Sequence, residues 1–160
     1  MVSNVVMEMI QYLGHDVKQV EHALKVFAYA TTIAEREGLC GGRMMALQSA
    51  ALLHDIAVPQ VLDDTGYAPG HLQESLGAPI ARDIMIAAGL GALAERVHYL
   101  VGHHHTYTEE MEENEDLQIL IEADHLVNVS EGHVHAPLEE VMNRFFSTHA
   151  GKELMTTLYL

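Results

Sequence analysis

The stretch Ser49-Ala50-Ala51-Leu52-Leu53-His54-Asp55-Ile56 decides how the rest of the sequence is interpreted. An apolar run ends here in a histidine, and an aspartate follows it at once. If the run is helical, His54 continues the buried face of its own helix. A buried carboxylate without a partner costs several kcal/mol of folding free energy or stays protonated. We therefore expect His54 and Asp55 to share a partner, and a divalent cation satisfies both.

The composition describes an acidic chain with a substantial core. Its 160 residues are 49% hydrophobic and carry 8 Lys and Arg against 23 Asp and Glu. The length suits one domain over residues 1–160, and the charge argues against a long nucleic-acid partner. No apolar run approaches the roughly 20 residues of a membrane span, and the N-terminus lacks the basic region of a signal peptide. The single cysteine, Cys40, suits a reducing cytoplasm, so we predict a cytoplasmic protein.

Hydrophobic periodicity predicts an all-α bundle of about seven helices, because no segment alternates as a strand does. The predicted helices cover residues 4–13, 16–38, a run ending at 54, 71–88, 93–105, 117–129 and 137–146, with a short helix or tail at 149–160. Residues 16–38 are expected to form a central helix with most of its circumference covered. Residues 57–70 contain four Pro and Gly breakers and are expected to be irregular. The acidic segment 108–116 is expected to be a solvated connection.

Two further polar side chains fall on apolar helix faces. His22 shares a face with Val26 and Ile33, which points its imidazole inward. Taken alone, His22 is better explained as a hydrogen-bonded core histidine. Asp124 interrupts the apolar stripe of the helix over 117–129. The alternative for Asp124 is a buried salt bridge to one of the few arginines, Arg82 or Arg96.

Together these anomalies form a set of two imidazoles and two carboxylates from three helices. Such a nitrogen and oxygen set suits Mn²⁺, Fe²⁺, Co²⁺, Ni²⁺ or Zn²⁺. Further histidines lie near the end of the helix over 93–105. His104 extends the apolar face of that helix and His103 borders it, whereas His98 and His105 are expected to be exposed or outside direct contact with a metal.

The ordered set resembles the HD superfamily of metal-dependent phosphohydrolases. In chain order the matching residues are Glu21-His22, Leu53-His54-Asp55, His71, His103-His104 and Ala123-Asp124. The resemblance covers about residues 16–130 and leaves the C-terminal helices over 137–160 outside it. It implies an HD-domain helical bundle in which His22, His54, Asp55 and Asp124 hold a first metal ion.

The additional histidines, His71, His103 and His104, are similar to those of binuclear members such as bacterial diadenosine tetraphosphate hydrolases and HD-GYP cyclic-dinucleotide phosphodiesterases. The resemblance thus implies one or two divalent ions, with Asp55 bridging them if there are two. The sequence departs from many members after the His-Asp pair, where Ile56-Ala57-Val58 replaces Ile-Gly-Lys. The Gly-Tyr-Pro signature is also absent, which argues against a cyclic-dinucleotide substrate.

The resemblance implies hydrolysis of a phosphate ester, of a nucleotide or another small molecule, by a metal-activated water. Catalytic roles are expected for Asp55 and for Glu74 or His71, which could orient the water or protonate the leaving oxygen. The candidates for binding phosphate are Arg43, Arg82 and Arg96. Two alternatives remain, a di-iron oxygenase of the same fold and a non-catalytic metal-binding module. The apolar end of the chain, Leu154 to Leu160, must dock on the core or on a second subunit of a homo-oligomer.

Overall fold

The computed structural model describes residues 1–106 and 114–160, and these residues are all-helical, as predicted. The helices of the described residues are α1 (Val2–Leu13), α2 (Val17–Arg36), α3 (Gly41–Leu53), α4 (Val58–Thr65), α5 (Gly70–Ala87), the 3₁₀ helix η1 (Gly91–Leu93), α6 (Ala94–His103), α7 (Glu115–Ser130), α8 (Leu138–Phe145) and α9 (His149–Tyr159). The sequence predicted about seven helices and missed the short elements, above all α4.

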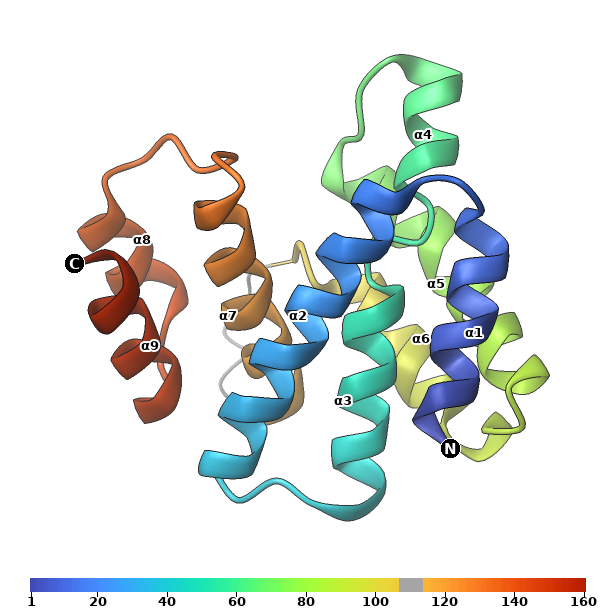
Figure 1. Cartoon of the computed structure of the whole chain (residues 1–160), viewed down its shortest axis with the longest axis horizontal. Helices are drawn as coiled ribbons and strands as arrows, with labels where there is room; N and C mark the ends of the chain where they lie inside the picture. Colours follow the sequence, from blue (N-terminus) through green and yellow to red (C-terminus); the bar gives the residue numbers. More distant parts are fainter. Residues whose placement is uncertain (107–113) are drawn as a thin grey trace.

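Three helices, α2, α3 and α7, run side by side through the middle of the molecule (Figure 1) and contact one another in every pair. On one side, α1, α5 and α6 pack against this group, with α6 lying on α3. On the other side, α9 packs against α7 and α2, and α8 lies on α9. The short helix α4 projects beyond the end of α3 (Figure 1). Side chains that point inward from α2, α3 and α7 therefore meet at the centre.

The most enclosed helices are α3 and α7, not the predicted central helix α2. Every residue from Ser49 to Leu53 of α3 is buried, and the alanines among them let neighbouring helices approach closely. By contrast α2 buries one face, and Leu24 on its other side is 39% exposed. The central position of α2 is as predicted, but the expected coverage of most of its circumference was wrong, because apolar composition alone does not tell whether a neighbour covers a given face.

Both ends of α2 carry residues that suit a helix end. The side chain of Asp16 accepts a hydrogen bond from Gln19 N at 3.1 Å and caps α2, as expected of an N-cap aspartate. Gly38, just beyond the end of α2, adopts a φ of 86°, which side chains disfavour. The first helix begins at Val2 rather than at Asn4, whose side chain instead donates to Ala88 O at 3.2 Å.

Two other predictions fail for identifiable reasons. Within the segment expected to be irregular, α4 forms over Val58–Thr65, because Pro59 occupies the first turn, where its missing N–H is not needed. Asp116 was expected in a solvated connection, but it is buried in the first turn of α7 and accepts a hydrogen bond from Arg96 Nε at 2.9 Å. Residues 108–113 of that connection lie outside the described residues.

The C-terminal helix docks only partly on the core. Met155 is buried, while Leu158 and Leu160 are 47% and 51% exposed. Among residues 1–106 and 114–160, none of the helices combines the length and apolar character that crossing a bilayer requires.

Candidate metal centre

The His-Asp pair stands in the tight turn that joins α3 to α4. Helix α3 ends at Leu53, and the turn is closed by hydrogen bonds from Ile56 N to Leu53 O (3.1 Å) and from Val58 N to Asp55 O (3.0 Å). This turn directs His54 into the core, where it is fully buried, and leaves the Asp55 side chain 17% exposed. One turn therefore supplies a buried imidazole and a carboxylate that borders solvent.

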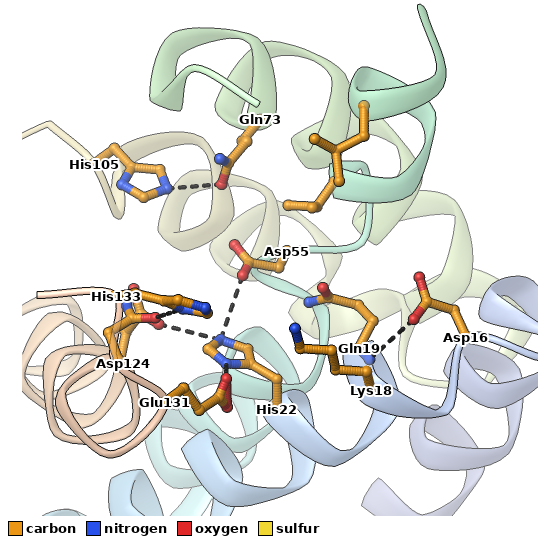
Figure 2. A pocket seen from close by; sticks show the side chains of 13 residues that line it. Asp16, Lys18, Gln19, His22, Asp55, Gln73, His105, Asp124, Glu131 and His133 are labelled. Atoms are coloured by element: carbon orange, nitrogen blue, oxygen red, sulfur yellow. Dashed lines mark hydrogen bonds and ion pairs between the residues drawn. The ribbon is translucent and has the colours of Figure 1, made fainter. Parts of the chain in front are cut away.

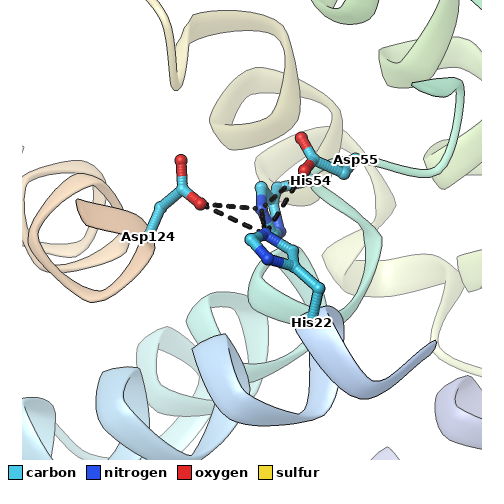
Figure 3. Close-up of side chains that lie close together, drawn as sticks. All are labelled: His22, His54, Asp55 and Asp124. Carbon is cyan, nitrogen blue, oxygen red and sulfur yellow. Dashed lines mark hydrogen bonds and ion pairs between the residues drawn. The ribbon is translucent and has the colours of Figure 1, made fainter. Parts of the chain in front are cut away.

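Four side chains, from α2, α7 and the turn that follows α3, converge on one point (Figure 3). His22 Nε2 lies 3.3 Å from Asp55 Oδ2, 3.3 Å from Asp124 Oδ1 and 3.2 Å from His54 Nε2. His54 Nε2 lies 3.4 Å from Asp55 Oδ2 and 3.3 Å from Asp124 Oδ1. The four ligand atoms all lie within 4.8 Å of one another, which is close enough for a single cation to reach them all.

A second group shares Asp55 with the first. Asp55, His104 and His105 also offer ligand atoms within 4.8 Å of one another, and His104 Nε2 lies 3.5 Å from Asp55 Oδ1. The two oxygens of Asp55 thus face different groups, Oδ2 toward His22 and His54, and Oδ1 toward His104. A carboxylate in this position could bridge two ions.

The outer ring nitrogens of the histidines are hydrogen-bonded, which directs the other nitrogens toward the centre. Nδ1 of His54 lies 2.8 Å from Ala51 O, and Nδ1 of His104 lies 2.6 Å from Val101 O. A carbonyl oxygen only accepts, so these Nδ1 atoms carry the proton, and in the neutral ring Nε2 is the free ligand atom.

Two atoms at the centre lack a hydrogen-bond partner. Among the described residues, Asp124 Oδ1 and His104 Nε2 are buried and make no hydrogen bond. Such atoms are costly in a folded protein unless something else satisfies them. Both belong to side chains of the two groups, and the donor set of imidazole nitrogens and carboxylate oxygens fits a divalent transition metal.

Electrostatics at the centre favour a positive charge between the side chains. Burial disfavours protonation of His22, but the adjacent carboxylates of Asp124 and Asp55 outweigh it and raise the pKa of His22 to about 9. Burial likewise opposes ionisation of the two acids, yet the imidazoles beside them keep the pKa of Asp55 and of Asp124 well below the usual range. Burial next to His104 lowers the pKa of His105 to about 4, so this ring is neutral, as a metal ligand must be.

The first group opens into a pocket of about 390 Å³ (Figure 2). Its lining consists of Asp16, Lys18, Gln19, His22, Asp55, Val58, Leu62, Gln73, His105, Asp124, Asn128, Glu131 and His133. These residues come from the start of α2, the turn after α3, α4 and α5, the turn after α6, and the C-terminal half of α7 with the loop after it. A small molecule in this pocket would reach Asp55 and Asp124 directly.

Two of the predicted metal ligands, His71 and His103, are not brought to either group. Both line a separate pocket on α5 and α6, and His103 Nδ1 lies 2.7 Å from Tyr99 O. The predicted catalytic Glu74 lies there too, and it accepts hydrogen bonds from His105 N at 2.8 Å and Thr106 Oγ1 at 3.0 Å. Glu74 thus holds the turn that contains His105, and it does not line the pocket beside the metal centre.

The predicted phosphate-binding arginines are each paired with an acidic residue. These pairs are Arg43 with Glu115 (3.6 Å), Arg82 with Glu95 (2.6 Å) and Arg96 with Asp116 (2.9 Å). None of the three arginines belongs to the lining of the metal-centre pocket. Because Arg82 and Arg96 pair with other acids, neither is the partner of Asp124, and the alternative explanation of Asp124 as a buried salt bridge to one of them is wrong.

Sequence reasoning missed several residues of the centre. Lys18 lies four positions before His22, so helical spacing alone places it on the same face. Gln19, one position later, also lines the pocket. His105, which was expected to be exposed or outside direct contact with a metal, is partly buried beside Asp55 and His104, because helix α6 ends at His103 and the helical period does not extend past that end. Glu131, which lies 3.0 Å from His22 Nδ1, carried no signal in the sequence.

A comparison with protein-family models matches residues 20–129 to the HD domain. The chain belongs to the HD domain family. All residues of both groups, from His22 to Asp124, fall inside this HD domain match. Lys18, Glu131 and His133, which line the pocket, fall outside it.

Among solved structures, the HD domain is similar to a crystal structure of a predicted HD superfamily hydrolase from an uncultured Thermotogales bacterium. The two are 21% identical, with a TM-score of 0.69, and the match covers 97% of this chain and 83% of the other. At this identity the likeness supports the fold alone. A comparison with curated proteins found no match.

Proposed function

We propose that this HD domain is a metal-dependent phosphohydrolase that cleaves a phosphate ester of a nucleotide or another small molecule. The observation that supports it best is the convergence of His22, His54, Asp55 and Asp124 at the base of an open pocket. We infer that these four side chains hold a first divalent ion. We further infer that Asp55, His104 and His105 would hold a second ion, so that Asp55 belongs to both ligand groups.

A divalent ion bound there would lower the pKa of a water molecule and polarise a phosphoryl oxygen. The protein's part is to hold the substrate beside the centre. Among the described residues, Lys18 is the one basic side chain other than histidine in the pocket lining, and we assign it the phosphate contact in place of the three arginines. Gln19 Nε2 is buried without a hydrogen-bond partner among the described residues, so it is a second donor available to the substrate.

Proton transfer to the leaving group needs an ionisable side chain that reaches the substrate. His71 and Glu74 were predicted for this role, but neither is part of the pocket lining. His133 lines the pocket without belonging to either ligand group. We therefore propose His133 as the proton donor.

The pocket is suited to a small partner. Four of its lining residues are acidic, and only bound cations together with Lys18 would offset them for an anionic substrate. This local arrangement supports a small phosphorylated molecule, such as a nucleotide, and not a long nucleic acid, which needs an extended basic surface. The exposed free thiol of Cys40 suits a reducing compartment, so we propose a cytoplasmic location.

A di-iron oxygenase is the second candidate, because the group formed by Asp55, His104 and His105 would allow a binuclear centre. The two functions differ in their requirement for oxygen. A hydrolase releases inorganic phosphate under anaerobic conditions with Mn²⁺ or Co²⁺, whereas an oxygenase needs iron and consumes O₂.

The test is phosphate release from a panel of nucleotides and phosphomonoesters with each of Mn²⁺, Fe²⁺, Co²⁺, Ni²⁺ and Zn²⁺. We expect at least one ester to be hydrolysed, and His54→Ala to reduce the rate at least about a hundredfold because the ion is lost. Lys18→Met should raise KM more than it lowers kcat.

The matched control is His135→Ala, which removes an exposed imidazole that belongs to neither ligand group. Its rate should equal that of the wild type. Absence of hydrolysis with every metal, or equal loss in His54→Ala and His135→Ala, would refute the proposed function.

A further inference from the structure

His22 differs from the other histidines of the centre in the group that holds its outer nitrogen. His54 and His104 donate to main-chain carbonyls, and His105 Nε2 faces the amide oxygen of Gln73 at 2.9 Å. His22 Nδ1 instead faces the carboxylate of Glu131, with Oε1 at 3.0 Å and Oε2 at 3.2 Å. Of these four imidazoles, His22 alone has a negatively charged partner there.

Helix α7 holds the His22 ring from both ends. Asp124 in the middle of α7 lies 3.3 Å from Nε2, and Glu131, seven residues later at the C-terminal end of the same helix, contacts Nδ1. A spacing of seven residues is two helical turns, so both carboxylates project from the same side of α7. Figure 2 shows the His22 ring in contact with both Asp124 and Glu131, with Glu131 on the side away from Asp55.

Glu131 is placed to act on the ring with little interference from solvent. Its side chain is 13% exposed, and Lys25, the basic residue beside it, is 51% exposed with Nζ 3.7 Å from Oε1. A carboxylate that accepts the Nδ1 proton fixes the ring tautomer and makes Nε2 a stronger electron donor toward a metal. Lys25 competes for the same oxygen and weakens this effect.

We propose that Glu131 is a positioning residue that sets the metal affinity of the centre through His22. It directs the Nε2 lone pair toward Asp55 and Asp124 and strengthens that nitrogen as a ligand. The proposal rests on the proposed function only in requiring that the centre binds a divalent ion.

The test compares Mn²⁺ affinity, measured by calorimetric titration with a competing chelator, among variants of the full chain. Glu131→Ala should weaken binding by about 10- to 100-fold, the effect expected when an outer partner of a metal ligand is lost. Glu131→Gln keeps an acceptor oxygen but not the charge, and should weaken binding only a few-fold. Lys25→Met should strengthen binding slightly, because it frees the carboxylate. Glu139→Gln, at an exposed acid of α8, is the control and should leave affinity unchanged.

A second readout is the Nδ1–H proton of His22 in the Zn²⁺-loaded protein, observed by NMR. It should be protected from exchange in the wild type and in Glu131→Gln, and lost to exchange in Glu131→Ala. A purely structural role, as an ion pair with Lys25, predicts instead that Lys25→Met weakens binding as Glu131→Ala does.

The positioning role of Glu131 and the proposed function can be refuted separately. If Glu131→Ala binds Mn²⁺ within twofold of the wild type, the positioning role is wrong even when phosphate release is normal. If the wild type binds Mn²⁺ and Glu131→Ala weakens it, but no ester is hydrolysed, the positioning role stands and the proposed function falls. A wild type that binds no divalent ion overturns both.

Discussion

Two buried carboxylates on α7, only two residues apart, have entirely different surroundings. Glu122 is fully buried and accepts hydrogen bonds from Ser147 N at 2.7 Å, Thr148 N at 2.9 Å and Gln118 Nε2 at 2.7 Å. It thereby ties the start of α9 to α7. Asp124 points to the opposite region, where its neighbours are imidazoles and its Oδ1 makes no hydrogen bond within the described residues.

The difference shows that burial of an acid does not by itself mark a functional site. Asp116, a third buried acid of α7, is paired with Arg96. Like Glu122, it has a structural role. In these two cases N–H donors of the protein itself satisfy the carboxylate, and no bound ion is required. At Asp124 the partners are histidines, which satisfy the carboxylate only when they carry a proton, and which can exchange that proton for a metal ion.

The largest effect should come from Asp124→Ala. Losing one of four ligands should weaken Mn²⁺ binding at least about a hundredfold and abolish hydrolysis of any ester that the wild type cleaves. Thermal unfolding with and without Mn²⁺ measures this directly, because a ligand that binds only the native state raises the Tm. The wild type should show the shift and the variant should not. Equal shifts in both would remove Asp124 from the centre.

Glu122→Ala should produce the opposite pattern. It leaves two main-chain N–H groups without their acceptor and removes one of the two acceptors of the Gln118 amide, which should cost about 3 kcal/mol of unfolding free energy. Metal affinity per folded molecule should remain that of the wild type, since Glu122 belongs to neither ligand group. Urea denaturation and metal titration test the two parts separately. A loss of affinity without a loss of stability would contradict the structural assignment of Glu122.

The pH dependence of the unfolding free energy should also differ between the surroundings of Asp124 and those of Glu122. The pKa of His22 is raised to about 9 in the folded protein, above the value of about 6.5 in an unfolded chain. Its stabilising contribution is thus complete below pH 6.5 and is lost as the pH rises through 9. Without metal, the unfolding free energy should fall by about 3 kcal/mol between pH 6.5 and 9.5.

Urea denaturation in the presence of a chelator measures this fall. Because the partners of Glu122 do not titrate in that range, Glu122→Ala should show the same fall as the wild type. Asp124→Asn, which removes one cause of the raised pKa, should show a smaller one. Stability that is constant or rises with pH would contradict the proposed protonation of the centre.

The smallest effect concerns the second group. A Cβ added at Gly70 would lie 3.0 Å from Cβ and Cγ of His105, so Gly70→Ala must displace that ring. Binding of a second ion should weaken about tenfold, while the first should bind unchanged. Two-site analysis of a Mn²⁺ titration distinguishes them. A variant in which both sites weaken equally would mean that His105 does not act in a separate group.

The first ligand group was predictable from the sequence because helical periodicity determines which side chains share a face. His22, Asp124 and the His54-Asp55 pair each stood out as polar groups on apolar faces, and the structure brings them together. The all-helical fold follows from the same period. No knowledge of how the helices pack was needed for either inference, since a buried charged group must find a partner somewhere.

What failed depended on contacts between elements. The charge of Arg82 is evident in the sequence, but its pairing with Glu95 is not. His105 lies beyond the end of α6, where the periodic pattern no longer applies. Glu131 is an ordinary polar residue at a helix end until the fold brings its carboxylate to His22. Such residues are found only once the packing is known.

The most direct test of the metal centre is a crystal structure grown with Zn²⁺ and measured by anomalous scattering. The predicted result is a peak at about 2.0–2.2 Å from His22 Nε2, His54 Nε2 and an oxygen each of Asp55 and Asp124. A second peak roughly 4 Å away, toward His104 and His105, would indicate two ions. Crystals that contain Zn²⁺ elsewhere but show no peak between these four side chains would contradict the central claim.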